Sequence, residues 1–250
     1  MNEYVKNLNR IEFEVTLACT GNCKHCSEGD HTNHTGHIDP AAAATAVREI
    51  CECYPIQSLM TFGGEALLYP DVVCSIHRVG AELGIPKRDL ITNGYFSKDP
   101  RKIRDVVHVL HENGVLRILL SVDAFHQETI PLEPVKYFAE CVRETPIHIA
   151  LSPAWLVSEN DPNPYNLQTK AILQEFSALH IPVGAGNVIF PSGNARKYLR
   201  EYFDETVVYT NPYDEDPYDI RTLSFSPNGD VLGGNIYQTK ILDILDTYRP

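Results

Sequence analysis

Three cysteines within one short stretch are the most chemically informative feature of the chain: Cys19, Cys23 and Cys26, spaced Cys-x3-Cys-x2-Cys. Thiolates are ligands for soft metals, and iron–sulfur clusters are normally held by four of them. No fourth cysteine follows at a comparable spacing. An open coordination position distinguishes a catalytic metal site from a structural one. The triad therefore predicts a cluster with one iron left open to a ligand that is not a side chain.

Other residues that could take part in binding or catalysis come directly after expected strands. Gly63-Gly64-Glu65 follows a buried strand, Asn93 follows the next one, and Ser121 and Asp123 close a third. The carboxyl ends of parallel strands meet at one edge of a sheet or barrel, where active sites form. We therefore expect these side chains to lie together, near the cysteines that follow the first strand.

The elements that would position these residues alternate between strand and helix. Apolar runs bounded by turn residues predict six strands, and amphipathic runs between them predict helices. Such alternation implies parallel strands joined by right-handed crossovers, and six units fit an incomplete barrel better than a closed eightfold one. The expected fold class is α/β, a partial (βα)6 TIM-like barrel. The expected strands are 11–17, 58–62, 89–92, 115–122, 147–151 and 183–189.

The regular alternation of strand and helix patterns ends near residue 192. A helix is expected over 196–203 and a last helix over 237–248, and Pro227-Asn228-Gly229 predicts a hairpin turn between strands at 223–226 and 230–232. The chain is therefore expected to divide into a barrel domain, residues 1–192, and a short α+β extension, residues 193–250.

Composition narrows the classes of partner and compartment. The chain has 250 residues and a net charge of −12, without the basic patch typical of nucleic-acid binders. It has no apolar run long enough to span a bilayer and no signal-peptide pattern at its start. Seven cysteines without a disulfide framework indicate a reducing compartment. We therefore expect a cytoplasmic protein that binds neither nucleic acid nor membrane.

The triad after a first strand, followed by Gly63-Gly64-Glu65 after a second, resembles the radical S-adenosylmethionine (radical SAM) enzymes over roughly residues 10–190. The resemblance implies that Cys19, Cys23 and Cys26 hold a [4Fe-4S] cluster. The fourth iron would then chelate the amino and carboxylate groups of S-adenosylmethionine.

The resemblance also implies contacts to S-adenosylmethionine. The glycines would let the backbone approach the methionine moiety, and Glu65 would support the turn or meet the ammonium group. Residues after the third and fourth strands would contact the ribose or the methionine carboxylate, and a histidine and the stretch 184–187 would lie near the adenine. The expected contact residues are His25, Gly63, Gly64, Glu65, Asn93, Ser121 and Asp123.

The activity implied is reductive cleavage of S-adenosylmethionine to a 5′-deoxyadenosyl radical, which takes a hydrogen atom from a peptide or a small polar metabolite. An external one-electron donor such as flavodoxin or ferredoxin would be needed. The segment 226–236 resembles a SPASM/twitch-type extension, but no cysteine follows Cys141, so no auxiliary cluster is predicted. That favours redox-neutral outcomes such as epimerisation or rearrangement, so the enzyme would be an isomerase or an oxidoreductase. No catalytic residue or hydrogen-atom donor is assigned.

Several alternatives stay open at this point. The triad with His25 or a later histidine could form a structural zinc site, and the fold could serve a non-catalytic peptide- or partner-binding protein. His31, His34 and His37 could form a second metal site or a solvated loop. His126 could face substrate or solvent. Cys74 could donate a hydrogen atom, although a free cysteine is more often buried and inert.

Overall fold

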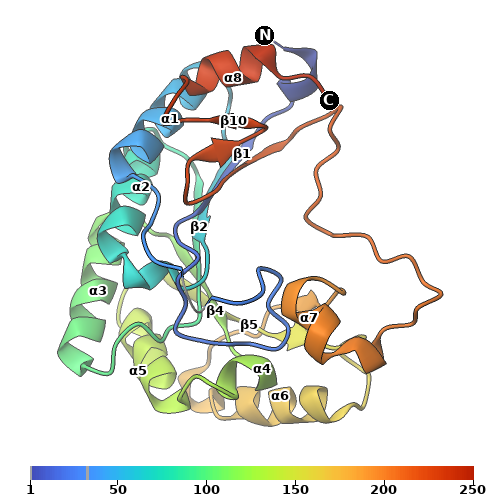
Figure 1. The fold of residues 1–250 in the computed structure, drawn as a ribbon. Helices are drawn as coiled ribbons and strands as arrows, with labels where there is room; N and C mark the ends of the chain where they lie inside the picture. Colours follow the sequence, from blue (N-terminus) through green and yellow to red (C-terminus); the bar gives the residue numbers. More distant parts are fainter. Residues whose placement is uncertain (1, 32–33) are drawn as a thin grey trace.

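The computed structural model, which describes residues 2–31 and 34–250, contains a six-stranded sheet in which every neighbouring pair of strands is parallel (Figure 1). The strand order is β5-β4-β3-β2-β1-β8. The α/β class is confirmed, and the first five expected strands are found at nearly the expected positions. The strands of this sheet are β1 (Arg10–Glu14), β2 (Ser58–Phe62), β3 (Lys87–Thr92), β4 (Arg117–Ser121), β5 (His148–Ser152) and β8 (Thr222–Phe225).

Three of the helices begin at a step in which Asp or Asn precedes Pro. The side chains of Asp39, Asp99 and Asn163 each accept a hydrogen bond from a backbone N–H of the first turn, at 2.7, 2.9 and 2.9 Å. Proline in that turn loses no hydrogen bond, because those N–H groups have no partner within the helix. No helix of the described residues is long and apolar enough to cross a membrane. The helices are α1 (Pro40–Cys53), α2 (Pro70–Glu82), α3 (Pro100–Glu112), α4 (Ala124–Gln127), α5 (Leu132–Arg143), α6 (Pro164–Gln174), α7 (Gly193–Tyr198) and α8 (Ile241–Thr247).

Helices α1, α2, α3 and α5 cover one face of the sheet (Figure 1). Alternate strand residues such as Phe13, Leu59 and Ile118 are fully buried in this layer. Their neighbours along the strands point the other way, because side chains alternate across a strand. On β1 those neighbours include Glu12 and Glu14, both partly exposed. The helix-covered face is therefore the hydrophobic core, and the opposite face carries both charged and apolar side chains.

His77 of α2 is a fully buried titratable group in this core, and it predicts a pH dependence of stability. Its Nε2 lies 2.9 Å from the Thr61 hydroxyl, and burial, then the charge of Arg88, lower the pKa of His77 to about 3. In the unfolded chain His77 takes up a proton as the pH falls below 6.5, whereas in the folded protein it stays neutral until about pH 3. Stability should be fully present above pH 6.5 and should fall by about 1.4 kcal/mol per pH unit below it.

The measurement is the denaturant midpoint of wild type, His77→Leu and the exposed-site variant His111→Leu between pH 7.5 and pH 4.5. We expect a flatter pH profile only for His77→Leu, whatever its absolute stability. Equal slopes for all three proteins would show that His77 does not carry this dependence.

The expected sixth strand at 183–189 is wrong. Val183 makes a single bridge to Leu151, and β7 (Asn187–Val188) pairs with β6 (Ala154–Trp155) in a separate two-stranded parallel sheet. Gly186 has φ +69°, outside the extended region, and a Cβ there would lie 2.1 Å from the Pro153 carbonyl oxygen. This glycine breaks the strand that the apolar pattern predicted.

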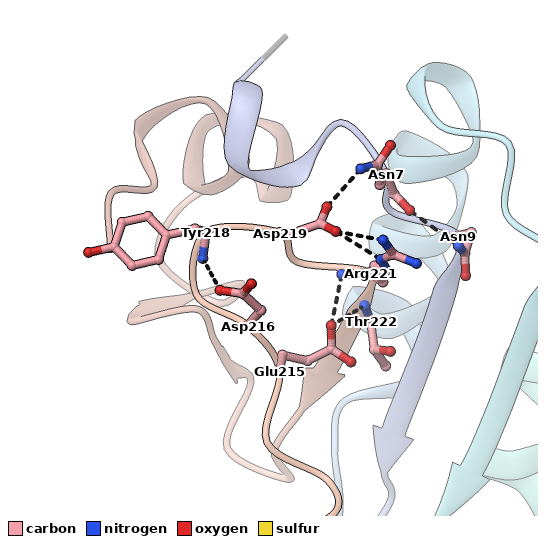
Figure 2. A network of polar contacts seen from close by, with 8 residues as sticks. All are labelled: Asn7, Asn9, Glu215, Asp216, Tyr218, Asp219, Arg221 and Thr222. Atoms are coloured by element: carbon pink, nitrogen blue, oxygen red, sulfur yellow. Dashed lines mark hydrogen bonds and ion pairs between the residues drawn. The ribbon is translucent and has the colours of Figure 1, made fainter.

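The sixth strand is instead β8, which pairs in parallel with β1, and a polar network lies where the segments that precede the two strands meet (Figure 2). Asn7 donates to Asp219 at 2.7 Å, and Arg221 donates to the same carboxylate at 2.8 Å. Glu215 accepts from the backbone N–H groups of Arg221 and Thr222. The Asn7–Asp219 bond joins the two segments, and the buried rings of Phe13 on β1 and Phe225 on β8 stack with their centroids 4.7 Å apart.

The expected hairpin also differs in its strands. The backbone turns at 227–229, but the antiparallel pair is β9 (Asp230–Val231) with β10 (Gly234–Asn235), and 223–225 belongs to the main sheet. Leu232 and Gly233 both have positive φ, the conformation of tight hairpin turns, so the reversal falls there. The resemblance of 226–236 to a SPASM/twitch-type segment and the division of the chain at residue 192 both stay predictions.

Candidate functional site

The three cysteines of the triad lie on the loop between β1 and α1, dark blue in Figure 1, next to α4 and α7. None of the three forms a disulfide, and Cys23 is the most buried of them. Hydrogen bonds hold the first residues of this loop in place. The Thr16 hydroxyl donates to the Gly36 carbonyl at 2.6 Å and accepts from the Ala18 N–H at 3.0 Å. The sequence therefore presents three free thiols from one anchored loop.

The thiols lie close enough to influence one another's ionisation. Burial raises the pKa of Cys19 to about 11, and the charges of Glu65 and Cys26 add to the effect. Burial raises the pKa of Cys23 as well, with contributions from the charges of Asp123, Cys19 and Cys26. Metal binding requires deprotonated thiols. Three free thiols on one loop, close enough for the charge of one to raise the pKa of another, form a donor set that suits the cluster that the sequence predicts.

Gly63 and Gly64 bring β2 into direct backbone contact with the start of the cysteine loop. The Gly64 N–H donates to the Thr16 carbonyl at 2.7 Å, and a Cβ on Gly64 would lie 2.3 Å from the Ala18 carbonyl oxygen. A Cβ on Gly63, whose φ is +145°, would lie 2.4 Å from the Thr16 carbonyl oxygen. Both glycines are thus required by close packing on this loop, and their contact with a methionine moiety stays a prediction.

Glu65 is fully buried and holds the ends of two strands together. Its Oε1 accepts from the Leu67 N–H at 2.9 Å and from the Thr92 hydroxyl at 2.6 Å, and its Oε2 accepts from the Asn93 N–H at 2.8 Å. Burial raises the pKa of Glu65, and these hydrogen bonds oppose that rise. Of the two roles expected for Glu65, supporting the turn is the one that these contacts perform.

Asn93 links the end of β3 to the first cysteine. Its Nδ2 donates to the Thr20 hydroxyl oxygen at 3.2 Å and lies 3.7 Å from the Cys19 sulfur. Its Oδ1 accepts from the Tyr95 N–H at 2.8 Å, which fixes the side-chain orientation. The structure therefore brings Asn93 to the cysteine loop, as the strand-end argument predicted.

Asp123 is fully buried after β4 and organises the next segment. It caps α4 by accepting from the N–H groups of Phe125 and His126, and it accepts from the Ala154 N–H at 3.0 Å. Burial raises the pKa of Asp123, but the facing His126 ring and these hydrogen bonds outweigh it and lower the pKa to about 2. Ser121 lies beside Ser152 in the ladder, and its hydroxyl makes no hydrogen bond with the described residues. Contact of either residue with a cofactor stays a prediction.

His25 and His126 meet beside Cys23. The ring centroids are 4.9 Å apart, and one ligand atom from each of Cys23, His25 and His126 lies within 4.8 Å of the others. Burial lowers the pKa of His25 to about 4, and its Nδ1 is buried without a hydrogen-bond partner among the described residues. These rings form one wall of the site. The later histidines of the cysteine loop are not in this group; Thr32 and Asn33, between them, lie outside the described residues.

Two residues at this edge were not chosen from the sequence. His126 was weighed but left open, and its spacing of three from Asp123 at a helix start was the signal for a facing pair. Glu14 closes β1 with its Oε1 buried and without a hydrogen-bond partner among the described residues. Burial and the charge of Glu28 raise the pKa of Glu14 to about 7. Its signal was the alternation of Glu12 and Glu14 with the core residue Phe13.

The remaining cysteines lie away from this edge. Cys74 is 7% exposed within α2, on the helix-covered side of the sheet, and burial raises its pKa to about 11. Cys141 is buried within α5, and Cys53, at the end of α1, is exposed. The structure thus places Cys74 in the core, as expected for an inert thiol.

Comparison with known proteins gives a consistent picture. The family model described as the radical SAM superfamily matches residues 13–150. The chain is 25% identical over 129 residues to a GTP 3′,8-cyclase of Clostridium perfringens, covering 51% of this chain and 38% of that protein. It is 23% identical over 145 residues to the putative peptide biosynthesis protein YydG of Bacillus subtilis, covering 58% and 45%. The chain therefore spans less than half the length of these two curated relatives.

Solved structures share the fold. The structure of anSMEcpe with bound AdoMet superposes with a TM-score of 0.62 at 13% identity, covering 96% of this chain and 80% of that one. Its complex with AdoMet and the Kp18Cys peptide gives a TM-score of 0.58 at 13% identity, with the same coverage. At this identity the likeness concerns the fold alone.

Proposed function

This chain belongs to the radical SAM superfamily, and we propose that it cleaves S-adenosylmethionine reductively and abstracts a hydrogen atom from a peptide. Enzymes of this superfamily bind a [4Fe-4S] cluster and S-adenosylmethionine. In this chain Cys19, Cys23 and Cys26 would hold the cluster. When bound, the cluster and S-adenosylmethionine together supply an electron and a 5′-deoxyadenosyl radical.

The chain's own residues position and enclose that chemistry. Gly63, Gly64 and Glu65 hold the turn after β2 against the cysteine loop, and Asn93 holds the end of β3 to the same loop. Asp123 fixes the end of β4 and orients His126. His25 is partly buried, and it offers a ring face and one nitrogen without a hydrogen-bond partner among the described residues. We propose that these groups bind the amino acid and nucleoside parts of S-adenosylmethionine.

One observation carries the proposal. Three free thiols on one loop lie against the ends of β2, β3 and β4, and each strand end contributes a buried polar side chain: Glu65, Asn93 and Asp123. Buried polar groups are costly unless they are hydrogen-bonded. All three are hydrogen-bonded within the protein, so they hold the strand ends in a fixed arrangement beside the thiols, where a metal cluster and a polar cofactor would bind.

We propose a peptide as the substrate class. A relative is named for peptide biosynthesis, and a fold neighbour was solved with a bound peptide. No cysteine follows Cys141 in this sequence, so an auxiliary cluster held by later cysteines is not proposed. We therefore propose a redox-neutral outcome such as epimerisation, with an external flavodoxin or ferredoxin as electron donor.

The test is anaerobic reconstitution with iron and sulfide, followed by dithionite and S-adenosylmethionine. We expect about four irons per chain and 5′-deoxyadenosine and methionine as products by mass spectrometry. The control omits dithionite and should yield neither product. A colourless protein that binds zinc would instead support the structural zinc site. A loaded cluster without 5′-deoxyadenosine would support a non-catalytic binding protein on this fold.

A further inference from the structure

The helix α7, which follows the barrel segment in sequence, lies directly against the cysteine loop (Figure 1). Asn194, at the second position of this helix, is 7% exposed. Its backbone N–H donates to the Cys26 carbonyl at 2.9 Å, and its Nδ2 donates to the carbonyls of Cys23 and Gly29, each at 3.1 Å. Two carbonyl acceptors face the side chain, so its amide nitrogen must point toward them. One residue from outside the barrel strands thus holds the backbone at two of the three cysteines.

The approach of the helix to the loop depends on the residue before Asn194. Gly193 has φ +43°, and a Cβ there would lie 2.3 Å from the Ser27 carbonyl oxygen and 2.5 Å from that of Cys26. These are backbone atoms, which cannot rotate away. Ser192 adds a hydrogen bond from its hydroxyl to the Ser27 carbonyl at 3.2 Å. Ser192, Gly193 and Asn194 therefore pack closely on the outer side of the cysteine loop and form hydrogen bonds with its carbonyl groups.

The helix is anchored independently of this contact. Ala195 and Leu199 are fully buried, and they belong to a small hydrophobic cluster that includes Cys23, Phe125 and Leu156. Because this packing holds α7 against the sheet end, the helix gives Asn194 a rigid base. The packing of Ala195 and Leu199 therefore stabilises the contact between the helix and the loop.

The turn that Asn194 holds begins at Cys26. The Gly29 N–H donates to the Cys26 carbonyl at 3.4 Å, and the Cys26 sulfur lies 3.0 Å from Nε2 of His31. Asn194 bonds the carbonyls at both ends of this turn, those of Cys26 and Gly29. Hydrogen bonds to cluster sulfurs set the reduction potential of iron–sulfur centres, and the residues that orient the ligands tune the metal.

We propose that Asn194 is a positioning residue for the cluster, which fixes the backbone at Cys23 and Cys26 and thereby holds the two sulfurs in place. This inference rests on the proposed function, since it requires a cluster at the triad. It gives the segment after residue 192 a role at the active site even though that segment contains no cysteine.

The test compares reconstituted wild type with Asn194→Asp, Asn194→Ala, Ser192→Ala and the control Lys197→Ala, an exposed residue of the same helix. Aspartate keeps the size and the backbone N–H but replaces two donors with an acceptor that faces carbonyls. Redox titration followed by EPR, without S-adenosylmethionine, gives the midpoint potential. We expect Asn194→Asp to lower the potential by the equivalent of a tenfold change in the reduction equilibrium, about 59 mV for one electron. Ser192→Ala should cause a smaller shift in the same direction, and Lys197→Ala none.

Circular dichroism of the apo forms identifies any variant that does not fold, and in that case the Ser192→Ala shift decides. Wild-type potentials in Ser192→Ala and in the folded Asn194 variants would overturn the role of Asn194 and leave the proposed function standing. A wild-type protein that takes up no cluster would instead overturn the proposed function itself.

Discussion

Cys23→Ala should fold, hold no intact cluster and form no detectable 5′-deoxyadenosine. Cys23 is the central member of the triad and is 7% exposed, so its loss removes a ligand that solvent cannot easily replace. No other cysteine can take its place, because the rest of the thiols belong to helices on the outer layer. Removal of one sulfur from a buried position should cost about 1 kcal/mol of stability, too little to unfold the chain.

The measurements are iron and acid-labile sulfide per chain, the EPR signal of the reduced protein and the yield of 5′-deoxyadenosine under anaerobic conditions. Cys53→Ala is the matched control, because Cys53 is exposed at the end of α1 and should leave all three readouts unchanged. If Cys23→Ala retains wild-type iron content and product formation, the triad is not the cluster site.

The three cysteines contact three different parts of the fold. Cys19 lies against Asn93 at the end of β3, and Cys23 lies against the rings that follow β4. The backbone at Cys26 is held by Asn194 of α7. A loop of ordinary flexibility is therefore immobilised from three sides, as is required for ligands that must keep a fixed geometry.

The site could be predicted from the sequence to the extent that its signals are local. The cysteine spacing, the glycine pair before Glu65 and the strand-end position of Asn93 all depend on residues near one another in the chain. The parallel arrangement of strands then brought them to one edge without further information. Asn194 carried no such signal, because its role depends on a contact with carbonyls about 165 residues away in sequence.

The same distinction explains the fold. Helix starts such as Asp39-Pro40 are fixed by adjacent residues. The placement of β8 beside β1 involves contacts between residues far apart in the sequence, such as the Asn7–Asp219 hydrogen bond and the Phe13–Phe225 stacking. The apolar run at 183–189 satisfied the strand pattern, but the positive φ of Gly186 and its close approach to Pro153 prevented a long strand there.

Glu65→Gln should destabilise the protein and abolish cleavage of S-adenosylmethionine, although the side chain keeps its shape. Two backbone N–H groups, those of Leu67 and Asn93, and the Thr92 hydroxyl all donate to this buried carboxylate. An amide places an NH2 group opposite at least one of these donors, so a buried donor loses its acceptor. Each such loss costs about 1–3 kcal/mol. The turn after β2 and the end of β3 should then separate, which displaces Gly64 and Asn93 from the cysteine loop.

The comparison is with Glu52→Gln, an exposed change of the same type on α1, which should match wild type. Denaturant midpoints of the apo proteins give the stability, and equilibrium dialysis of the reconstituted proteins gives the affinity for S-adenosylmethionine. We expect Glu65→Gln to lower both. Unchanged stability with lost affinity would instead place the carboxylate in direct contact with the cofactor's ammonium group, because such a contact contributes to binding and not to the fold of the empty protein. The two measurements together therefore separate the roles that the sequence left open for this residue.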